Sequence, residues 1–210
     1  MTRHRRLPAL TALTIVAAVL VTGCATAAPA GDAPPGSSLG SLWPAPPEGE
    51  VIAQGMVMDV AGVVELCLGA VQESYPPQCS GLPLAEWSWD RLDGSETSGD
   101  VTWGSYAVQG TYDGETFTVT QPPIMLALYD PMMLDDPTGG EPGAGDEAEL
   151  QEIQDGLPDA LGDALLGSTP DNGWLWVDVV WDDGTWQDAA DADYGEGVVV
   201  IRSALRAIDG

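Results

Sequence analysis

The stretch Ser105–Thr120, SYAVQGTYDGETFTVT, carries the clearest structural signal in this chain. Two runs rich in aromatic and β-branched residues flank the dipeptide Asp113-Gly114. Asp-Gly favours the positive φ angles of a type I′ turn, which joins two antiparallel strands. The stretch therefore predicts a β-hairpin in which Ser105–Tyr112 pairs with Glu115–Thr120.

A second hairpin is predicted earlier in the chain, where Ala61-Gly62 separates the β-type runs Val51–Val60 and Val63–Leu68. Four or five short strands that begin with one hairpin and end with another predict a small β-barrel over residues 51–129. The order of the strands loosely resembles an oligonucleotide/oligosaccharide-binding fold. Trp87, Trp89 and Trp103 lie between the hairpins and either fill a core or form a sugar-stacking platform.

The amino terminus has the parts of an export signal. A start with three arginines precedes an apolar run, Ala9–Val21, that contains no acidic residue. A transmembrane helix needs about 20 apolar residues and this run has roughly 13, so a cleaved signal peptide over 1–23 is favoured over a membrane-spanning anchor.

The segment Val21-Thr22-Gly23-Cys24 resembles the lipobox of bacterial lipoproteins. The resemblance implies that Cys24 is acylated, by palmitate-type chains, and becomes the new amino terminus. A chance cysteine at the end of a signal is the alternative. The expected location is the extracytoplasmic face of the cell membrane, with the membrane as a partner through the lipid anchor.

Residues 24–50 combine the lipid anchor with a stretch rich in Ala, Pro, Gly and Ser that shows no sustained hydrophobic period. This composition predicts a tether, which would hold the folded part roughly 25–30 Å from its lipid.

Export also explains the other two cysteines. In an oxidising compartment, an even pair such as Cys67 and Cys79 predicts a disulfide. Such a crosslink of a short loop is worth about 3 kcal/mol in the chain-entropy model. A metal site at these thiols would need histidine or further cysteines nearby, and the sequence has none there.

The part of the chain beyond Cys24 is extremely acidic. Its three arginines against 33 acidic residues leave a formal charge of −30, and it contains no lysine. Such a surface repels nucleic acid and anionic lipid headgroups, so nucleic acid is excluded as a partner, and cations and basic partners are favoured. With 44% apolar residues and eight tryptophans, the chain is nevertheless predicted to fold.

Residues 130–147 form an acidic segment rich in proline and glycine, which predicts a linker. Its carboxylates could collect a calcium ion, but they do not follow the spacing of an EF-hand loop, and a solvated linker is the preferred interpretation. The acidic cluster over Asp182–Asp193 offers a second set of calcium ligands. The candidate metal ligands are Asp135, Asp136, Glu141, Asp146, Glu147, Asp182 and Asp183.

Residues 148–210 are predicted to form a small α+β domain. An apolar stripe at intervals of three and four residues predicts a helix over Leu150–Leu165, with a kink or a break into two helices near Pro158. Trp174–Trp181 and Val198–Ile201 are predicted strands. Thr185–Tyr194 is either a helix or a return strand, and the helix is favoured because Gly195 suits a C-terminal cap. The predicted fold class is therefore α+β, a disulfide-stapled barrel followed by a small α+β domain.

Four segments resemble exported lipoproteins and membrane-anchored proteins of GC-rich bacteria that carry no assigned activity. They are Val64-Glu65-Leu66-Cys67-Leu68-Gly69, Pro76-Pro77-Gln78-Cys79-Ser80-Gly81, Asp182-Asp183-Gly184-Thr185 and Tyr194-Gly195-Glu196-Gly197-Val198-Val199-Val200. The resemblance implies a class of exported protein and no residue of known role.

Most catalytic chemistry is excluded by residue type. The only histidine, His4, lies in the signal peptide, and there is no lysine, so histidine-based triads and Schiff bases are not available to the mature chain. No glycine-rich phosphate-binding motif occurs. The sequence therefore predicts a non-enzymatic binding or assembly module with an envelope protein or glycan as partner. The alternatives are a calcium-dependent envelope module and a carboxylate-based polysaccharide hydrolase.

Overall fold

The computed structural model describes residues 38–133 and 136–208. The signal peptide, the acylation site Cys24 and most of the predicted tether lie outside the described residues, so these remain predictions. Within the described ranges, no helix is long and apolar enough to cross a membrane.

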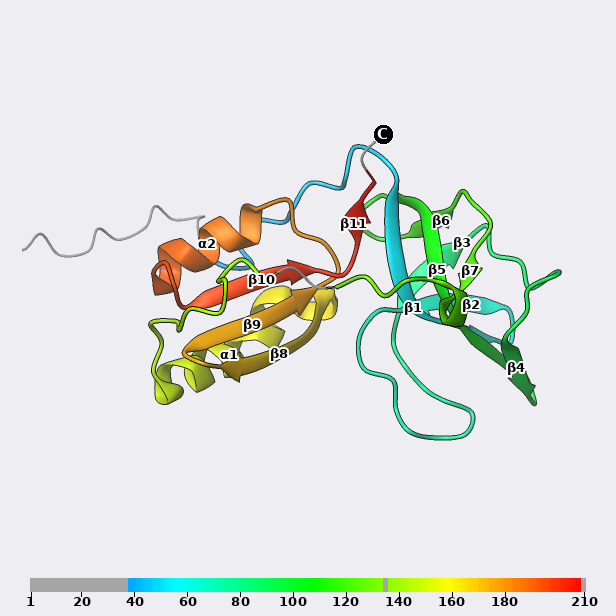
Figure 1. Ribbon diagram of the computed structural model, residues 1–210, viewed down its shortest axis with the longest axis horizontal. Helices are drawn as coiled ribbons and strands as arrows, with labels where there is room; N and C mark the ends of the chain where they lie inside the picture. The colour runs from blue at the N-terminus through cyan, green and yellow to red at the C-terminus, as the bar shows by residue number, and fades with distance from the viewer. Residues whose placement is uncertain (1–37, 134–135, 209–210) are drawn as a thin grey trace, which may run out of the picture. The chain divides into compact units, whose positions relative to one another are not determined.

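The first part of the fold is a closed five-stranded β-barrel, as predicted in outline (Figure 1). Its strands follow the order β1-β2-β3-β6-β5 and close through the pairing of β5 with β1. All these pairs are antiparallel except β3–β6, which is parallel. The barrel strands are β1 (Val51–Val60), β2 (Val63–Cys67), β3 (Leu82–Ala85), β5 (Val101–Tyr112) and β6 (Phe117–Val119). The additional elements are β4 (Ser95–Ser98), β7 (Ile124–Met125), the 3-10 turn η1 (Leu126–Leu128) and β11 (Arg206–Ala207).

Both predicted hairpins are confirmed. Strands β1 and β2 pair up to Val60 opposite Val63, and Ala61 and Gly62 both have positive φ, as a tight hairpin turn requires. Strands β5 and β6 form the second hairpin.

The predicted type I′ turn of the second hairpin is wrong. Pairing ends at Tyr112 opposite Phe117, which leaves a four-residue loop, and only Gly114 of the Asp113-Gly114 pair has positive φ. The Asp113 carboxylate accepts hydrogen bonds from the backbone N–H groups of Glu115 (2.9 Å) and Thr116 (2.7 Å). An aspartate side chain that bonds to its own loop in this way stabilises a wider turn.

The disulfide Cys67–Cys79 is present, as predicted. It ties the end of β2 to the following loop, with a Cα–Cα distance of 6.1 Å. The Sγ atom of Cys79 lies 3.3 Å from Sδ of Met58, and Met58, Cys67 and Trp103 form a small buried cluster.

The α+β part packs two helices against one face of a three-stranded sheet. Strand β9 lies between β8, which is antiparallel to it, and β10, which is parallel to it. The alternate residues Leu175, Val177 and Val179 of β9 are fully buried against the helices. The elements are α1 (Glu147–Leu161), the 3-10 turn η2 (Gly162–Ala164), β8 (Leu165–Asp171), β9 (Trp174–Val179), α2 (Thr185–Tyr194) and β10 (Val199–Ser203).

The helix over Thr185–Tyr194 is confirmed, and Gly195 caps it. Of the two alternatives predicted at Pro158, a kink or a break into two helices, the break is wrong, because α1 is one continuous helix with Pro158 inside it. Its stripe Leu150, Ile153, Leu157 and Leu161 is buried over the whole length, which offsets the roughly 3 kcal/mol that an interior proline costs. Leu165, the last residue of the predicted stripe, instead begins β8.

Residues 38–50 belong to the folded unit and not to the tether. Leu39 is 8% exposed and lies in the core of the α+β part. All the described residues, 38–133 and 136–208, fall within one compact unit. Only the residues before position 38 are left to serve as the predicted tether.

The described part of the predicted linker is also attached to the fold. The backbone N–H groups of Gly143 and Gly145 donate to the carbonyl oxygens of Asn172 (2.9 Å) and Gly173 (3.0 Å), at the turn between β8 and β9. Trp174 donates its indole N–H to the carbonyl oxygen of Glu141 at 2.8 Å.

The barrel and the α+β part share buried residues. Val180 and Leu205, which follow β9 and β10, lie in the same cluster as the barrel residues Val57, Val108 and Phe117. After Leu205, β11 pairs with β1, and the N–H of Ile208 donates to the carbonyl oxygen of Glu50 at 3.0 Å. The chain thus returns to the barrel after completing the α+β part.

We expect Leu205→Ala to lower the free energy of unfolding by about 2–5 kcal/mol, because it leaves a cavity where the two parts meet. Leu128→Ala, at a side chain that is 77% exposed, is the control and should change it by less than about 0.5 kcal/mol. Urea unfolding measured by circular dichroism compares the two. A loss no larger than that of the control would contradict the shared core.

Candidate functional site

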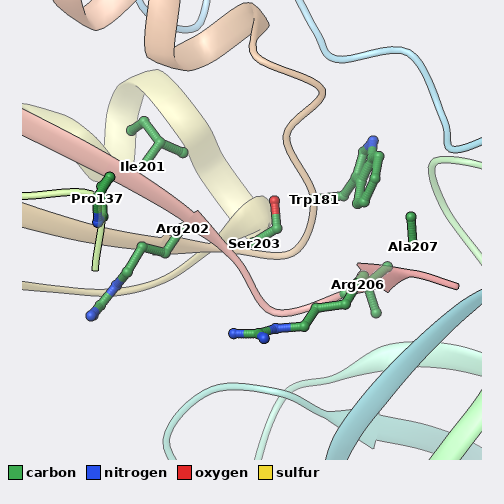
Figure 2. Close-up of a pocket in the computed structure, with 8 residues that line it drawn as sticks. Pro137, Trp181, Ile201, Arg202, Ser203, Arg206 and Ala207 are labelled. Atoms are coloured by element: carbon green, nitrogen blue, oxygen red, sulfur yellow. The ribbon is translucent and has the colours of Figure 1, made fainter. Parts of the chain in front are cut away.

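A cavity of about 360 Å³ lies where the last strands pass from the α+β part to the barrel. We call it the junction cavity (Figure 2). Its wall includes Trp181, Ile201, Arg202, Ser203, Leu205 and Arg206. Two of the three arginines beyond Cys24 are therefore in its lining.

The lining residues are positioned by the chain between β10 and β11. The backbone N–H groups of Ala204 and Leu205 donate to the carbonyl oxygens of Val179 (2.9 Å) and Val180 (3.1 Å). This pairing continues the parallel contact of β10 with β9 beyond the end of the strand. It holds Leu205 in the shared core and brings Arg206 to its pairing position opposite Ile52 of β1.

Arg202 is held rigidly by its cross-strand partner Asp178. Its Nε donates to one carboxylate oxygen at 2.8 Å and its Nη2 to the other at 3.1 Å. The guanidinium carbon also lies 4.8 Å from the centre of the Trp176 ring. A bidentate ion pair that is also stacked on an indole fixes the plane of the guanidinium.

Arg206 connects the end of the chain to the segment that follows the barrel. Its Nη2 donates to the backbone carbonyl oxygen of Met133. That segment is itself held by Gln54 of β1, whose side chain donates to the carbonyl oxygen of Asp130 (2.9 Å) and accepts from the N–H of Met132 (3.1 Å). The second arginine of the junction cavity is thus also fixed in place.

Trp181 and Ser203 line the cavity, but the polar atoms of their side chains form hydrogen bonds with backbone groups. The indole N–H of Trp181 donates to the carbonyl oxygen of Ala45 at 2.9 Å. The Ser203 hydroxyl accepts a hydrogen bond from the N–H of Asp182 at 2.8 Å. Because no base contacts this hydroxyl in the described residues, Ser203 has the surroundings of a structural residue and not of a nucleophile.

Asp182 and Asp183, predicted as metal ligands, stand at the amino-terminal end of α2. Asp182 accepts from the backbone N–H groups of Trp186 (2.9 Å) and Gln187 (3.2 Å). Asp183 accepts from the N–H groups of Thr185 (3.1 Å) and Ala45 (3.0 Å). Carboxylates at this end of a helix satisfy its free N–H groups.

Those of the remaining acidic candidates that the structure describes form no metal-holding cluster with this pair. Asp136 accepts from the hydroxyl of Thr138 at 2.6 Å, which is the main cause of its lowered pKa, and Arg202 contributes a smaller lowering. Asp146 caps α1, and Asp135 lies outside the described residues. Over the described ranges, no group of three or more His, Cys, Asp or Glu residues is arranged to hold a metal ion.

The tryptophans between the hairpins pack against the barrel core. Trp87 and Trp89 contact each other edge to face with centroids 5.2 Å apart, and both contact the buried Tyr106. Trp89 donates its indole N–H to Asp59 at 3.0 Å, and Trp103 is only 7% exposed. Trp103 is thus buried, and the partly buried Trp87 and Trp89 pack against the core, which favours the core interpretation for these residues.

Arg202 and Arg206 were not predicted as site residues from the sequence. The feature that could have pointed to them is the rarity of arginine, since two of the three arginines beyond Cys24 stand four positions apart. The chain matches no protein-family model, and comparisons with curated proteins and with solved structures find no match.

The neighbours Asp182 and Asp183 have pKa shifts of opposite sign. Burial is the main cause that raises the pKa of Asp182, whereas a hydrogen bond from the Thr185 side chain is the main cause that lowers the pKa of Asp183. Asp182 therefore contributes less to stability as the pH rises from the ordinary carboxyl pKa toward its raised value. The contribution of Asp183 is present above the ordinary value and is lost as the pH falls through its lowered one.

We expect Asp182→Asn and Asp183→Asn to change the pH dependence of unfolding in opposite directions. The stability of the wild type relative to Asp182→Asn should fall with rising pH, and its stability relative to Asp183→Asn should increase. Urea unfolding between about pH 3 and 7 measures both differences, since ordinary carboxyl pKa values lie near the lower end of this range. Differences of the same sign in both variants would mean that general charge repulsion dominates.

Proposed function

We propose that this protein is a lipid-anchored, extracytoplasmic, non-enzymatic binding module of the cell envelope. Its partner is an envelope glycan or protein that places an acidic group in the junction cavity. The observation that carries the proposal is the pairing of Arg202 and Arg206 at one cavity of a chain whose formal charge beyond Cys24 is −30.

The charge distribution supports an acidic group on the ligand. Outside the cavity, the many carboxylates repel an anion, and salt screens this repulsion beyond roughly 8–10 Å. At the cavity, Arg202 and Arg206 supply positive charge, although Arg202 already uses its Nε and Nη2 on Asp178. Guanidinium groups are well suited to bind carboxylates. Because both arginines are already held in place, binding requires little ordering of side chains.

The size and the apolar wall of the cavity support a small ligand unit. A volume of about 360 Å³ is at the lower end of the range for small-molecule sites and fits a single sugar ring or amino-acid residue. Trp181 and Ile201 are only partly buried and supply apolar surface to the lining, whereas Leu205 behind them is 1% exposed. A sugar that carries a carboxylate combines the flat apolar face and the charge that these residues match.

We also propose that the barrel is of the oligonucleotide/oligosaccharide-binding type. Its strands close in the order first, second, third, fifth, fourth, and the third and fifth are the parallel pair. This order supports a Greek-key barrel of that kind. The charge of the chain favours the oligosaccharide over the oligonucleotide as ligand class.

We propose that the cavity is not catalytic, because the carboxylates near it are already bonded to other side chains. A polysaccharide hydrolase needs two carboxyl groups that face the bond to be broken. The nearby carboxylates of Asp178 and Asp136 are instead bonded to Arg202 and Thr138. These contacts favour a binding role over the hydrolase alternative.

Binding is tested with N-acetylmuramate and N-acetylglucosamine, which differ by one carboxylate-bearing group. We expect N-acetylmuramate to cause saturable shifts of the Trp181 indole resonance in two-dimensional NMR, and N-acetylglucosamine to cause much smaller ones. Arg206→Gln should weaken the binding by roughly tenfold, as expected for the loss of a hydrogen bond to a charged group.

The matched control is Arg91→Gln, which removes the same charge at an exposed position of the barrel part. Arg91→Gln should leave the affinity unchanged at constant ionic strength. Equal losses in the two arginine variants, or equal responses to the two sugars, would contradict the proposed site.

The calcium-dependent alternative is tested by thermal unfolding of the chain from Ala25 onward, with chelator, calcium, magnesium and sodium chloride at matched ionic strength. Asp182, Asp183 and Asp146 already cap helices, so we expect all salts to raise the melting temperature to a similar extent by screening the charge. A saturable increase with calcium alone would instead show an ion bound to the native state.

A further inference from the structure

Residues 38–50 run from the α+β part to the start of β1, with a turn at 38–42 followed by an extended stretch at 43–47, and they form no strand pairing. We call this segment the strap. Its last residue, Glu50, is bonded to Gln109 and Thr120 of the barrel part. We call the residues that hold the strap on the α+β part the strap site. They are Ala160 of α1, Trp181 and Asp183 before α2, and Trp186 and Asp193 of α2.

The backbone of the strap is bonded by side chains of the strap site. Asp193 accepts from the N–H of Leu39 (2.8 Å), and Trp186 donates to the carbonyl oxygen of Leu42 (2.9 Å). At Ala45, Asp183 accepts from the N–H (3.0 Å) and Trp181 donates to the carbonyl oxygen (2.9 Å). Proteins that bind proline-rich peptides use grooves lined by aromatic side chains, and Trp181 and Trp186 are aromatic residues that bond to the strap here.

Two side chains of the strap serve as apolar anchors. Leu39 is 8% exposed among the core residues of both helices and β9. Trp43 contacts the buried Trp186 edge to face, with ring centroids 5.4 Å apart. Aromatic pairs of this geometry contribute beyond their buried area.

A third feature makes the fit selective. Gly40 has φ of +81°, and a Cβ atom at this position would overlap the backbone carbonyl of Ala160 in α1. Only glycine therefore allows the strap to approach the helix here. Pro44, Pro46 and Pro47 keep the rest of the segment extended before binding, which reduces the entropy that binding costs.

We infer that the strap site is a recognition site for a proline-containing peptide that turns at a glycine and then continues extended, and that the protein fills it with its own strap. When the strap leaves, the site accepts the same sequence from a separate peptide. Leu42 and Trp43 are 55% and 62% exposed and no strand pairing holds the strap, so Leu39 is the side chain of the strap whose burial opposes release.

Release has two consequences for the rest of the molecule. Residues 38–50 would join the chain that leads to Cys24, which increases the number of residues between the fold and the predicted lipid anchor. The indole N–H of Trp181 would lose its partner Ala45, and Trp181 also lines the junction cavity. The strap thus links the anchor side of the chain to the proposed ligand site.

The test uses Gly40→Val, which expels the strap and leaves every residue of the strap site unchanged. The matched control is Gly49→Val, because a Cβ on Gly49 meets no atom within 4 Å. The probe is a fluorescently labelled peptide with the sequence of residues 38–49, followed by fluorescence anisotropy at constant ionic strength. A second peptide carries valine at the position of Gly40.

We expect saturable binding of the first peptide to the Gly40→Val protein and at least tenfold weaker binding to the wild type and to Gly49→Val, in which the strap occupies the site. The valine peptide should bind at least tenfold more weakly than the first peptide to the Gly40→Val protein. Hydrogen exchange should show the amides of Leu39 and Ala45 exposed in Gly40→Val and protected in the control.

Two results would overturn the inference. One is that the peptide fails to bind Gly40→Val although hydrogen exchange shows a released strap on a folded protein. The other is that Gly40→Val and a second strap variant, Leu39→Ser, both lose the native fold, because a site for a separable peptide must persist without it. Neither result depends on whether the junction cavity binds a sugar.

Discussion

The structure depends on the return of the chain from β10 to the barrel. Leu205 enters the core that contains Val57 and Phe117, and the following residues pair with β1. Burying this leucine in a core built mainly by residues about 100 to 150 positions earlier removes apolar surface from both parts at once. The junction cavity and the position of Arg206 follow from this crossing, whereas Arg202 is placed by the pairing of β10 with β9.

The second feature that shapes the structure is the different placement of its acidic residues and its arginines. Acidic residues serve at the ends of elements, where Asp146 caps α1 and Asp182 accepts from the first N–H groups of α2. The arginines are used where parts of the chain meet, with Arg202 between two strands and Arg206 between the chain end and the segment at Met133. Two of the few positively charged side chains therefore lie at one cavity, and for this reason the proposed ligand carries an acidic group.

Local patterns in the sequence predicted local structure well. The two hairpins, the disulfide and the helix Thr185–Tyr194 each follow from residues that are close in sequence, because turn residues, cysteine spacing and caps act over a few positions. The turn at Asp113 was mispredicted since a side-chain hydrogen bond competes with the backbone preference. Helix α1 is unbroken for a different reason, because the burial of its apolar stripe outweighs the cost of the proline inside it.

The sequence analysis could not predict the contacts that build the candidate site. Leu39 lies in an Ala/Pro/Gly-rich segment, and its hydrogen-bond partner Asp193 is 154 residues away. Strand β11 has two residues and therefore no period to detect. Arg202 and Arg206 become a pair at a cavity only after β10, β11 and the segment around Pro137 have been brought together.

The account rests on the claim that the barrel and the α+β part form one cooperative unit. The direct measurement is urea unfolding followed residue by residue by NMR, with the amides of Val57 in β1 and Val177 in β9 as reporters. The shared core predicts the same midpoint at both residues, because a cooperative unit unfolds as a whole. Loss of the native signal at one residue while the other stays native would contradict the account and leave the junction cavity without a fixed shape.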